Sequence, residues 1–179
     1  MKPWKRIEPT VTAKVGHRMV ITKLFELSDG TVHDFQTFDR EGQEYAGVVA
    51  LTPDNQAIII EQFRPGPEQM MLDIPGGFVD EGETPEQAAA RELEEETGYK
   101  AGNLEYLGKV YKDPYNNATW HFFLATDCVE TGKGQALEET EEAGLKHISI
   151  DEFIANAKQA RMADVEAVFL AYDKLLELR

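Results

Sequence analysis

Apolar residues alternate with polar ones, or run together in short blocks, over most of the first 130 residues, and this pattern predicts β-strands. Segments 17–27 and 32–40 flank a Ser-Asp-Gly turn and predict a hairpin within a strand-rich region at residues 1–40. Apolar blocks at 45–52 and 56–63, separated by Pro-Asp-Asn, predict the next pair of strands. Further strands are expected at 104–111, 118–127 and 145–150.

A helix is expected near the middle of the chain, after residues 64–83, whose Pro and Gly content predicts a loop. Thr84 suits the N-cap, Pro85 the first helical position, and Gln87 completes a capping box. Gly98 is placed to end this helix.

Two more helices are expected near the C-terminus, at 151–160 and 163–178. The second is amphipathic, and the side chains expected to face inward are Val165, Val168, Phe169, Tyr172, Leu175 and Leu176. The order strands, helix, strands, helices predicts an α/β (α+β) fold with a mixed sheet covered by helices.

Composition and charge narrow the class of protein. The chain has 179 residues, 42% hydrophobic and 28% charged, which is ordinary for a globular domain. A net charge of −15 argues against nucleic-acid or anionic-membrane partners, because the field repels phosphate. No apolar stretch reaches membrane-spanning length, and no secretory signal is recognisable. A single cysteine, Cys128, excludes an intramolecular disulfide, and we expect a cytoplasmic protein.

The central helix carries an unusual density of acid, since residues 82–99 hold six acidic side chains. Glu92, Glu95 and Glu96 are three or four positions apart and share one helix face, and we expect Glu96 to be exposed. Carboxylates so close repel each other, and a divalent cation would relieve the repulsion. Oxygen ligands favour Mg²⁺ or Mn²⁺. The alternative is a solvated surface with no ligand.

The residues around this helix favour a ligand. Gly76 and Gly77 precede it where backbone can approach a ligand closely, and Arg91 is spaced to reach Glu83. The pattern runs Gly77, five residues, Glu83, seven residues, and then the segment RELEEETGY. It resembles the Nudix box, GX5EX7REUXEEXGU with U a bulky apolar residue, and Tyr99 stands where an aliphatic residue is usual.

The resemblance implies the Nudix fold, a mixed sheet sandwiched between helices. It also implies hydrolysis of a nucleoside diphosphate linked to another moiety, with Mg²⁺ or Mn²⁺. The metal ligands it implies are Glu92, Glu95, Glu96 and the Gly76 carbonyl, and Glu95 is also assigned to catalysis. Glu83 and Arg91 would orient the helix. Gly77 and Gly98 are structural positions of the motif.

The flanking residues are similar to the ADP-ribose pyrophosphatase branch of the family. Segment 61–83 resembles the branch's approach to the box, and Pro114 stands where the branch has a marker proline. Residues 1–42 would then be a β-rich segment exchanged between the subunits of a homodimer, and 43–179 the hydrolase domain. The implied substrate is ADP-ribose, cleaved to AMP and ribose 5-phosphate.

The same resemblance suggests residues that contact the substrate. Trp4 and Phe35 would grip the adenine by stacking, although Phe35 could equally be a core residue. Arg40 and Arg64 are candidate phosphate contacts, with a surface ion pair as the alternative for each.

The resemblance implies that the general base is a glutamate on an acidic loop after the box. The candidates in this chain are Glu138, Glu139, Glu141 and Glu142. Counting back from the segment KHISIDEF favours Glu139 or Glu141 but does not distinguish between them. The alternative is that this acidic loop has no role in catalysis. His121 is expected to be a core residue rather than a base.

Three other activities stay open. GDP-mannose or another nucleotide sugar could replace ADP-ribose, and a dinucleotide such as NADH is a further substrate to consider. A catalytically silent ligand sensor could keep the same fold, although an intact set of metal ligands argues against it.

Overall fold

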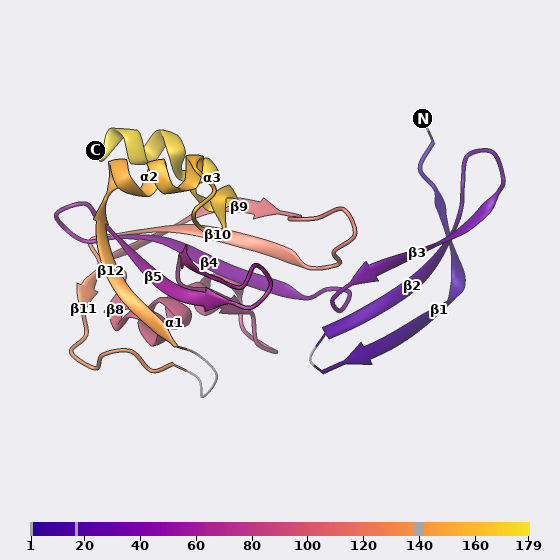
Figure 1. Cartoon of the computed structure of the whole chain (residues 1–179), viewed down its shortest axis with the longest axis horizontal. Helices are drawn as coiled ribbons and strands as arrows, with labels where there is room; N and C mark the ends of the chain where they lie inside the picture. The colour runs from indigo at the N-terminus through magenta and orange to yellow at the C-terminus, as the bar shows by residue number, and fades with distance from the viewer. Residues whose placement is uncertain (1, 17, 138–141) are drawn as a thin grey trace. The chain divides into compact units, whose positions relative to one another are not determined.

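A computed structural model of the chain describes residues 2–16, 18–137 and 142–179 (Figure 1). The chain divides into two compact units. The first comprises the residues up to Glu44 together with Tyr111–Thr119, and the second comprises Tyr45–Val110 and Trp120–Arg179. The expected division at residue 42 therefore stays a prediction, and each unit is described by itself.

The first unit is built on a three-stranded antiparallel sheet with the order β1-β2-β3. Its strands are β1 (Lys5–Val15), β2 (Arg18–Glu26) and β3 (Val32–Phe38). The hairpin predicted around Ser-Asp-Gly is confirmed, because β2 and β3 pair from Glu26 opposite Val32. The segment Tyr111–Thr119 adds to this sheet: the Phe38 amide donates to the Tyr115 carbonyl at 2.8 Å, and the Asn117 amide donates to the Phe38 carbonyl at 2.8 Å.

The second unit contains a seven-stranded sheet with the order β12-β5-β4-β10-β9, in which β6 also pairs with β5 and β7 with β4. The strands are β4 (Glu44–Leu51), β5 (Gln56–Arg64), β6 (Gln69–Asp73), β7 (Gly76–Phe78), β9 (Asn103–Val110), β10 (Thr119–Thr126) and β12 (Ala143–Ser149). A separate two-stranded sheet joins β8 (Tyr99–Lys100) to β11 (Val129–Glu130). The expected strands at 45–52, 56–63, 104–111, 118–127 and 145–150 are confirmed.

The prediction of a loop over 64–83 was wrong in part, because β6 and β7 lie within it. Both strands are short, and the Pro and Gly residues around them conceal any alternation. Their placement is tertiary: β6 pairs with β5, and β7 pairs with β4.

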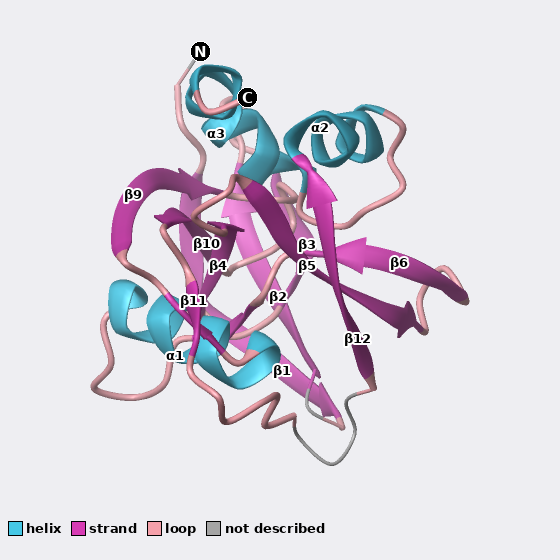
Figure 2. Cartoon of the chain, turned by 90° about the vertical axis from the view of Figure 1, so that its left-hand side faces the viewer, coloured by secondary structure: helices cyan, strands magenta, loops and turns pink. Residues whose placement is uncertain are grey.

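Three helices cover the large sheet: α1 (Pro85–Thr97), α2 (Ile150–Lys158) and α3 (Val165–Glu177). Figure 2 shows α1 on one face of this sheet and α2 with α3 on the other. Alternate residues of the central strands feed the two cores, with Val49 and Ile59 packing toward α2 and α3 and Val48 and Ile58 toward α1. Burial on both faces explains the continuous apolar blocks in these strands. No described helix is long and apolar enough to cross a membrane.

The helix α3 differs from its predicted orientation. Val168 and Leu175 are buried as expected, and Tyr172 is half-buried. Val165, Phe169 and Leu176 are exposed, Phe169 by 81%, so the prediction that they face inward was wrong. The helix rests on the sheet with the stripe Ala167, Val168, Ala171 and Leu175, and the wider apolar stripe read from the sequence includes side chains beyond that contact.

Candidate active site

Two glycines allow β4, β7 and α1 to meet. Gly76 pairs with Gly47 and Gly77 with Ala46 across the β4–β7 ladder. A Cβ atom on Gly76 would lie 2.5 Å from the Ala46 carbonyl oxygen, which real Cβ atoms essentially never approach. A Cβ atom on Gly77 would lie 2.2 Å from Oε1 of Glu92. The carboxylate of Glu92 therefore occupies the space that a side chain at position 77 would need.

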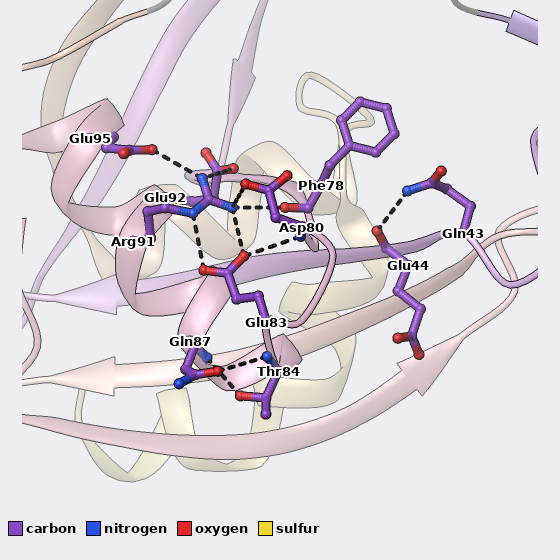
Figure 3. Close-up of polar contacts among 10 residues, drawn as sticks. All are labelled: Gln43, Glu44, Phe78, Asp80, Glu83, Thr84, Gln87, Arg91, Glu92 and Glu95. Atoms are coloured by element: carbon purple, nitrogen blue, oxygen red, sulfur yellow. Dashed lines mark hydrogen bonds and ion pairs between the residues drawn. The ribbon is translucent and has the colours of Figure 1, made fainter.

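The start and end of α1 follow from local chemistry. Thr84 is the N-cap, and its side chain accepts a hydrogen bond from the Gln87 amide, while the Gln87 side chain accepts from the Thr84 amide (Figure 3). Gly98 caps the C-terminus in the left-handed region, with φ of 76°. The predicted capping box and terminator are confirmed, and they fix which helical positions face β7.

Arg91 joins the acidic side chains beside α1 (Figure 3). Its Nε and Nη2 atoms donate to the two carboxylate oxygens of Glu83 at 3.1 and 3.0 Å. Its Nη1 atom donates to Glu92 at 2.7 Å and to Glu95 at 3.0 Å. Nη2 also donates to the Phe78 carbonyl at 2.9 Å. One guanidinium thus ties the loop before the helix to two carboxylates on the helix.

These bonds shift the acid–base properties of the cluster. Hydrogen bonds from Arg91 lower the pKa of Glu83 below its ordinary value. The hydrogen bond to Glu83 is also the main cause that raises the pKa of Arg91, with Glu92 and Glu95 adding to it. Glu83 therefore remains ionised and Arg91 protonated at neutral pH.

The Glu96 side chain points to the strand β7. Its Oε2 atom accepts a hydrogen bond from the Gly76 amide at 2.7 Å, and the residue is only 7% exposed. The prediction that Glu96 is exposed was wrong, because its side chain turns toward the backbone of β7. Glu95, by contrast, has a side chain that is 46% exposed.

The residues fit a divalent cation by the chemistry of their donors. Glu92 and Glu95 present carboxylate oxygens on one helix face, and the space beside Gly77 holds one of those carboxylates. Hard cations prefer such oxygen ligands. Within the described residues no group of three Asp, Glu, His or Cys side chains could hold a metal ion as the side chains lie here. Binding an ion would therefore require these carboxylates to exchange their bonds to Arg91 for bonds to the metal.

The segment that leads to the acidic loop is fastened to the C-terminal end of α1. The Ala136 amide donates to the Glu95 carbonyl at 2.7 Å. The Gln135 side-chain amide donates to the Glu96 carbonyl at 2.7 Å and to the Ala143 carbonyl at 3.3 Å. These contacts bring both described flanks of the acidic loop to the end of the helix, and no motif in the sequence indicated Gln135.

The structure describes only one of the four candidate bases. Glu138, Glu139 and Glu141 lie outside the described residues, and Glu142 is exposed just before β12. The choice among them stays a prediction.

Arg64, a predicted phosphate contact, lies at the end of β5 and forms an ion pair with Asp73 on β6. The Asp73 side chain is wholly buried and also accepts a hydrogen bond from the Ile74 amide at 3.1 Å. Sequence reasoning missed Asp73, because nothing in its neighbourhood marks a buried acid. The Arg64 side chain is 41% exposed.

The other predicted substrate contacts belong to the first unit. The rings of Trp4 and Phe35 stack on each other with centroids 5.2 Å apart. A base between two rings needs about twice the ~3.5 Å contact distance, so this pair has no room for one between them. The two rings fill the gap between them in this chain, and their contact with adenine stays a prediction. Arg40 and Pro114 are exposed, and Arg40 forms no ion pair among the residues described.

His121 and Cys128 are buried. His121 is 9% exposed and lies 3.3 Å from the Tyr106 hydroxyl through Nδ1, which suits the predicted core position. Burial raises the pKa of the Cys128 thiol to about 11.

Comparison with known proteins gives consistent results. Residues 43–171 match the NUDIX domain. The chain is 31% identical over 147 residues to the methanol dehydrogenase activator of Bacillus methanolicus, covering 80% of each protein. It is 30% identical to the ADP-ribose pyrophosphatase of Bacillus subtilis (strain 168), covering 68% of this chain and 66% of that protein. A crystal structure of an ADP compounds hydrolase superposes with a TM-score of 0.81 at 24% identity, covering 99% of this chain and 96% of that one, which shows the shared fold.

Proposed function

The chain belongs to the NUDIX family, and on that premise we propose that it hydrolyses the diphosphate bond of ADP-ribose to give AMP and ribose 5-phosphate. The observation that carries the proposal is the joining of Gly77, Arg91, Glu92 and Glu95 beside β7. The relative named ADP-ribose pyrophosphatase supports this choice of nucleotide sugar.

Mg²⁺ or Mn²⁺ would be held by Glu92, Glu95 and Glu96, with the Gly76 carbonyl as a further oxygen donor. When bound, the ion neutralises diphosphate charge and lowers the pKa of a water molecule. Arg91 holds the helix carboxylates in position through its bonds to Glu92 and Glu95.

A carboxylate of the acidic loop would accept the proton of the attacking water. Glu139 and Glu141 are the candidates, and the contacts of Gln135 with Glu96 and Ala143 support them by holding the flanks of their segment near the helix. Arg64 would bind a substrate phosphate through its guanidinium.

Trp4 would contribute to adenine binding through an outer ring face, or through exchange of the N-terminal segment in a homodimer. Trp4 is 49% exposed, and Phe25 and Phe35 lie beside it with ring centroids at 6.4 and 5.2 Å. An aromatic surface of this kind supports stacking with a base.

The test is a panel of ADP-ribose, ADP-glucose, GDP-mannose and NADH, each incubated with Mg²⁺ or Mn²⁺ and followed by chromatography of the nucleotide products. Release of AMP from ADP-ribose at the highest kcat/KM is the expected result. Faster release of GMP from GDP-mannose would show that GDP-mannose, and not ADP-ribose, is the preferred substrate. Absence of any product with every compound and both metals would favour a ligand sensor.

A second candidate function follows from the name of one relative. The chain covers 80% of a protein named methanol dehydrogenase activator, so activation of a dehydrogenase deserves a direct test. Adding the purified chain to a methanol dehydrogenase should raise its rate if this role applies. An unchanged dehydrogenase rate over a wide range of concentration of this chain would exclude the activator role.

A further inference from the structure

The helix α3 carries a second apolar stripe besides the one that packs on the sheet. Val165, Phe169, Tyr172 and Leu176 recur at spacings of four, three and four residues, which is the spacing of a helix–helix seam. Phe169 is 81% exposed, and Val165 and Leu176 are exposed with it. A helix with apolar residues on two sides is typical of one that is covered on both.

A groove of about 390 Å³ lies beside this stripe, between α2 and α3. Ile154, Ala157 and Lys158 line it from α2, and the N-terminal part of the stripe lines it from α3. The same patch therefore offers a protruding phenylalanine and a hollow large enough for one. A patch that contains both a projection and a matching hollow can pair with a copy of itself about a two-fold axis.

Charges at the edges of the patch decide how two copies would pair. The Lys158 ammonium lies 5.3 Å from the centre of the Tyr172 ring and 3.3 Å from its hydroxyl, on the α2 side. Glu166 and Asp173 flank the stripe seven residues apart, and Asp173 is exposed. Antiparallel α3 helices would bring Glu166 of one copy against Asp173 of the other, and these like charges repel.

Parallel pairing removes that conflict. Two α3 helices in the same register bring Asp173 to the level of Tyr172 of the second copy, and Lys158 of that copy lies at that level. Opposite charges then meet at both edges of a symmetric contact. Since α2 and α3 cover the sheet face opposite α1, such a contact leaves the acidic helix accessible.

We propose that the α2–α3 surface is a self-association interface, in which Phe169 of each copy enters the groove of the other and Asp173 pairs with Lys158 across the two-fold axis. The proposal does not depend on the hydrolase activity or on exchange of the N-terminal segment. It predicts a separate association step, whatever other contacts the copies make.

The first test is the mass of the full chain in solution by sedimentation equilibrium, over a wide range of concentration, for wild type and Phe169→Glu. The expected result is that the variant has half the limiting mass of the wild type, because a charge in the groove is not tolerated. Val129→Glu is the matched control, since Val129 is an exposed apolar residue on β11 outside the patch, and it should keep the wild-type mass. Equal masses for wild type and Phe169→Glu would overturn the proposal.

The second test exchanges the charges. Lys158→Glu and Asp173→Lys should each weaken association by about tenfold, because each change removes two symmetric ion pairs at the rim and adds repulsion. The double variant should restore wild-type association, because the pair is reversed in both copies. A double variant that associates as weakly as the two single variants combined would refute the parallel arrangement.

Discussion

Replacing Gly77 with alanine would displace the Glu92 carboxylate, and so tests whether the rate depends on where this group lies. The added Cβ would lie 2.2 Å from Oε1 of Glu92, and ordinary contact begins at 3.4 Å, so the carboxylate must retreat by about 1.2 Å. Misplacement of a catalytic group by about 1 Å can cost roughly 100-fold in rate, so we expect kcat to fall by about that factor. The clash is with the end of a flexible side chain, so the free energy of unfolding should fall by only about 1 kcal/mol.

Gly76→Ala is the matched control, because its clash is with backbone. Its Cβ would lie 2.5 Å from the Ala46 carbonyl oxygen and 2.8 Å from the Gly47 Cα atom, both held in β4. Overpacking against atoms that cannot retreat should cost about 3 kcal/mol. Thermal unfolding should show a shift of about 2–4 °C for Gly77→Ala and roughly three times that for Gly76→Ala.

The assay is the initial rate of nucleotide release at saturating substrate and metal, at a temperature where both variants are folded. Gly77→Ala should lose activity while remaining nearly as stable as the wild type. A Gly77→Ala enzyme within twofold of the wild-type kcat would refute this prediction, because the rate would then not depend on where Glu92 lies.

Four further predictions concern single residues. Glu96→Gln should abolish turnover with little change in unfolding midpoint, because the amide oxygen still accepts the backbone hydrogen bond; unchanged turnover would exclude Glu96 from the metal site. Glu83→Gln should cost about 2 kcal/mol at pH 7 through loss of the charged bonds to Arg91. Because Arg91 lowers the pKa of Glu83 in the folded chain, the difference in free energy of unfolding between wild type and Glu83→Gln should hold above about pH 5 and shrink when urea unfolding is repeated at lower pH. A difference that stays constant down to about pH 3 would contradict the lowered pKa of Glu83. Cys128, whose pKa is about 11, should resist iodoacetamide at pH 8 until the chain is unfolded, and rapid labelling of the native chain would show that the thiol is accessible. Trp4→Ala should raise KM more than it lowers kcat, and an unchanged KM would remove Trp4 from the site.

The elements with strong local signals were predictable from the sequence. The capping box at Thr84 and the left-handed cap at Gly98 bound α1 as expected, because both depend on chemistry within a few residues. The strands β4 and β5 were found from apolar blocks, since burial on both faces leaves that pattern. β6 and β7 were missed because their positions depend on pairing with distant strands.

The candidate site shows the same division between local and tertiary information. The spacing of Glu83 and Arg91 predicted their ion pair, because loop and helix bring them together over eight residues. The turn of Glu96 toward Gly76, and the bond between Arg64 and buried Asp73, depend on how strands pack and could not be inferred from spacing. The exposure of Phe169 is a further case, since periodicity identifies apolar faces but not what covers them.

The central claim is that the carboxylates of α1 hold a divalent cation, and Mn²⁺ binding followed by electron paramagnetic resonance tests it most directly. Titrating Mn²⁺ into the wild-type chain should remove the signal of the free ion, with Mg²⁺ restoring it by competition. Glu92→Gln, Glu95→Gln and Glu96→Gln should each weaken this uptake by tenfold or more. No uptake by the wild type at millimolar Mn²⁺, or equal uptake by all three variants, would contradict the account.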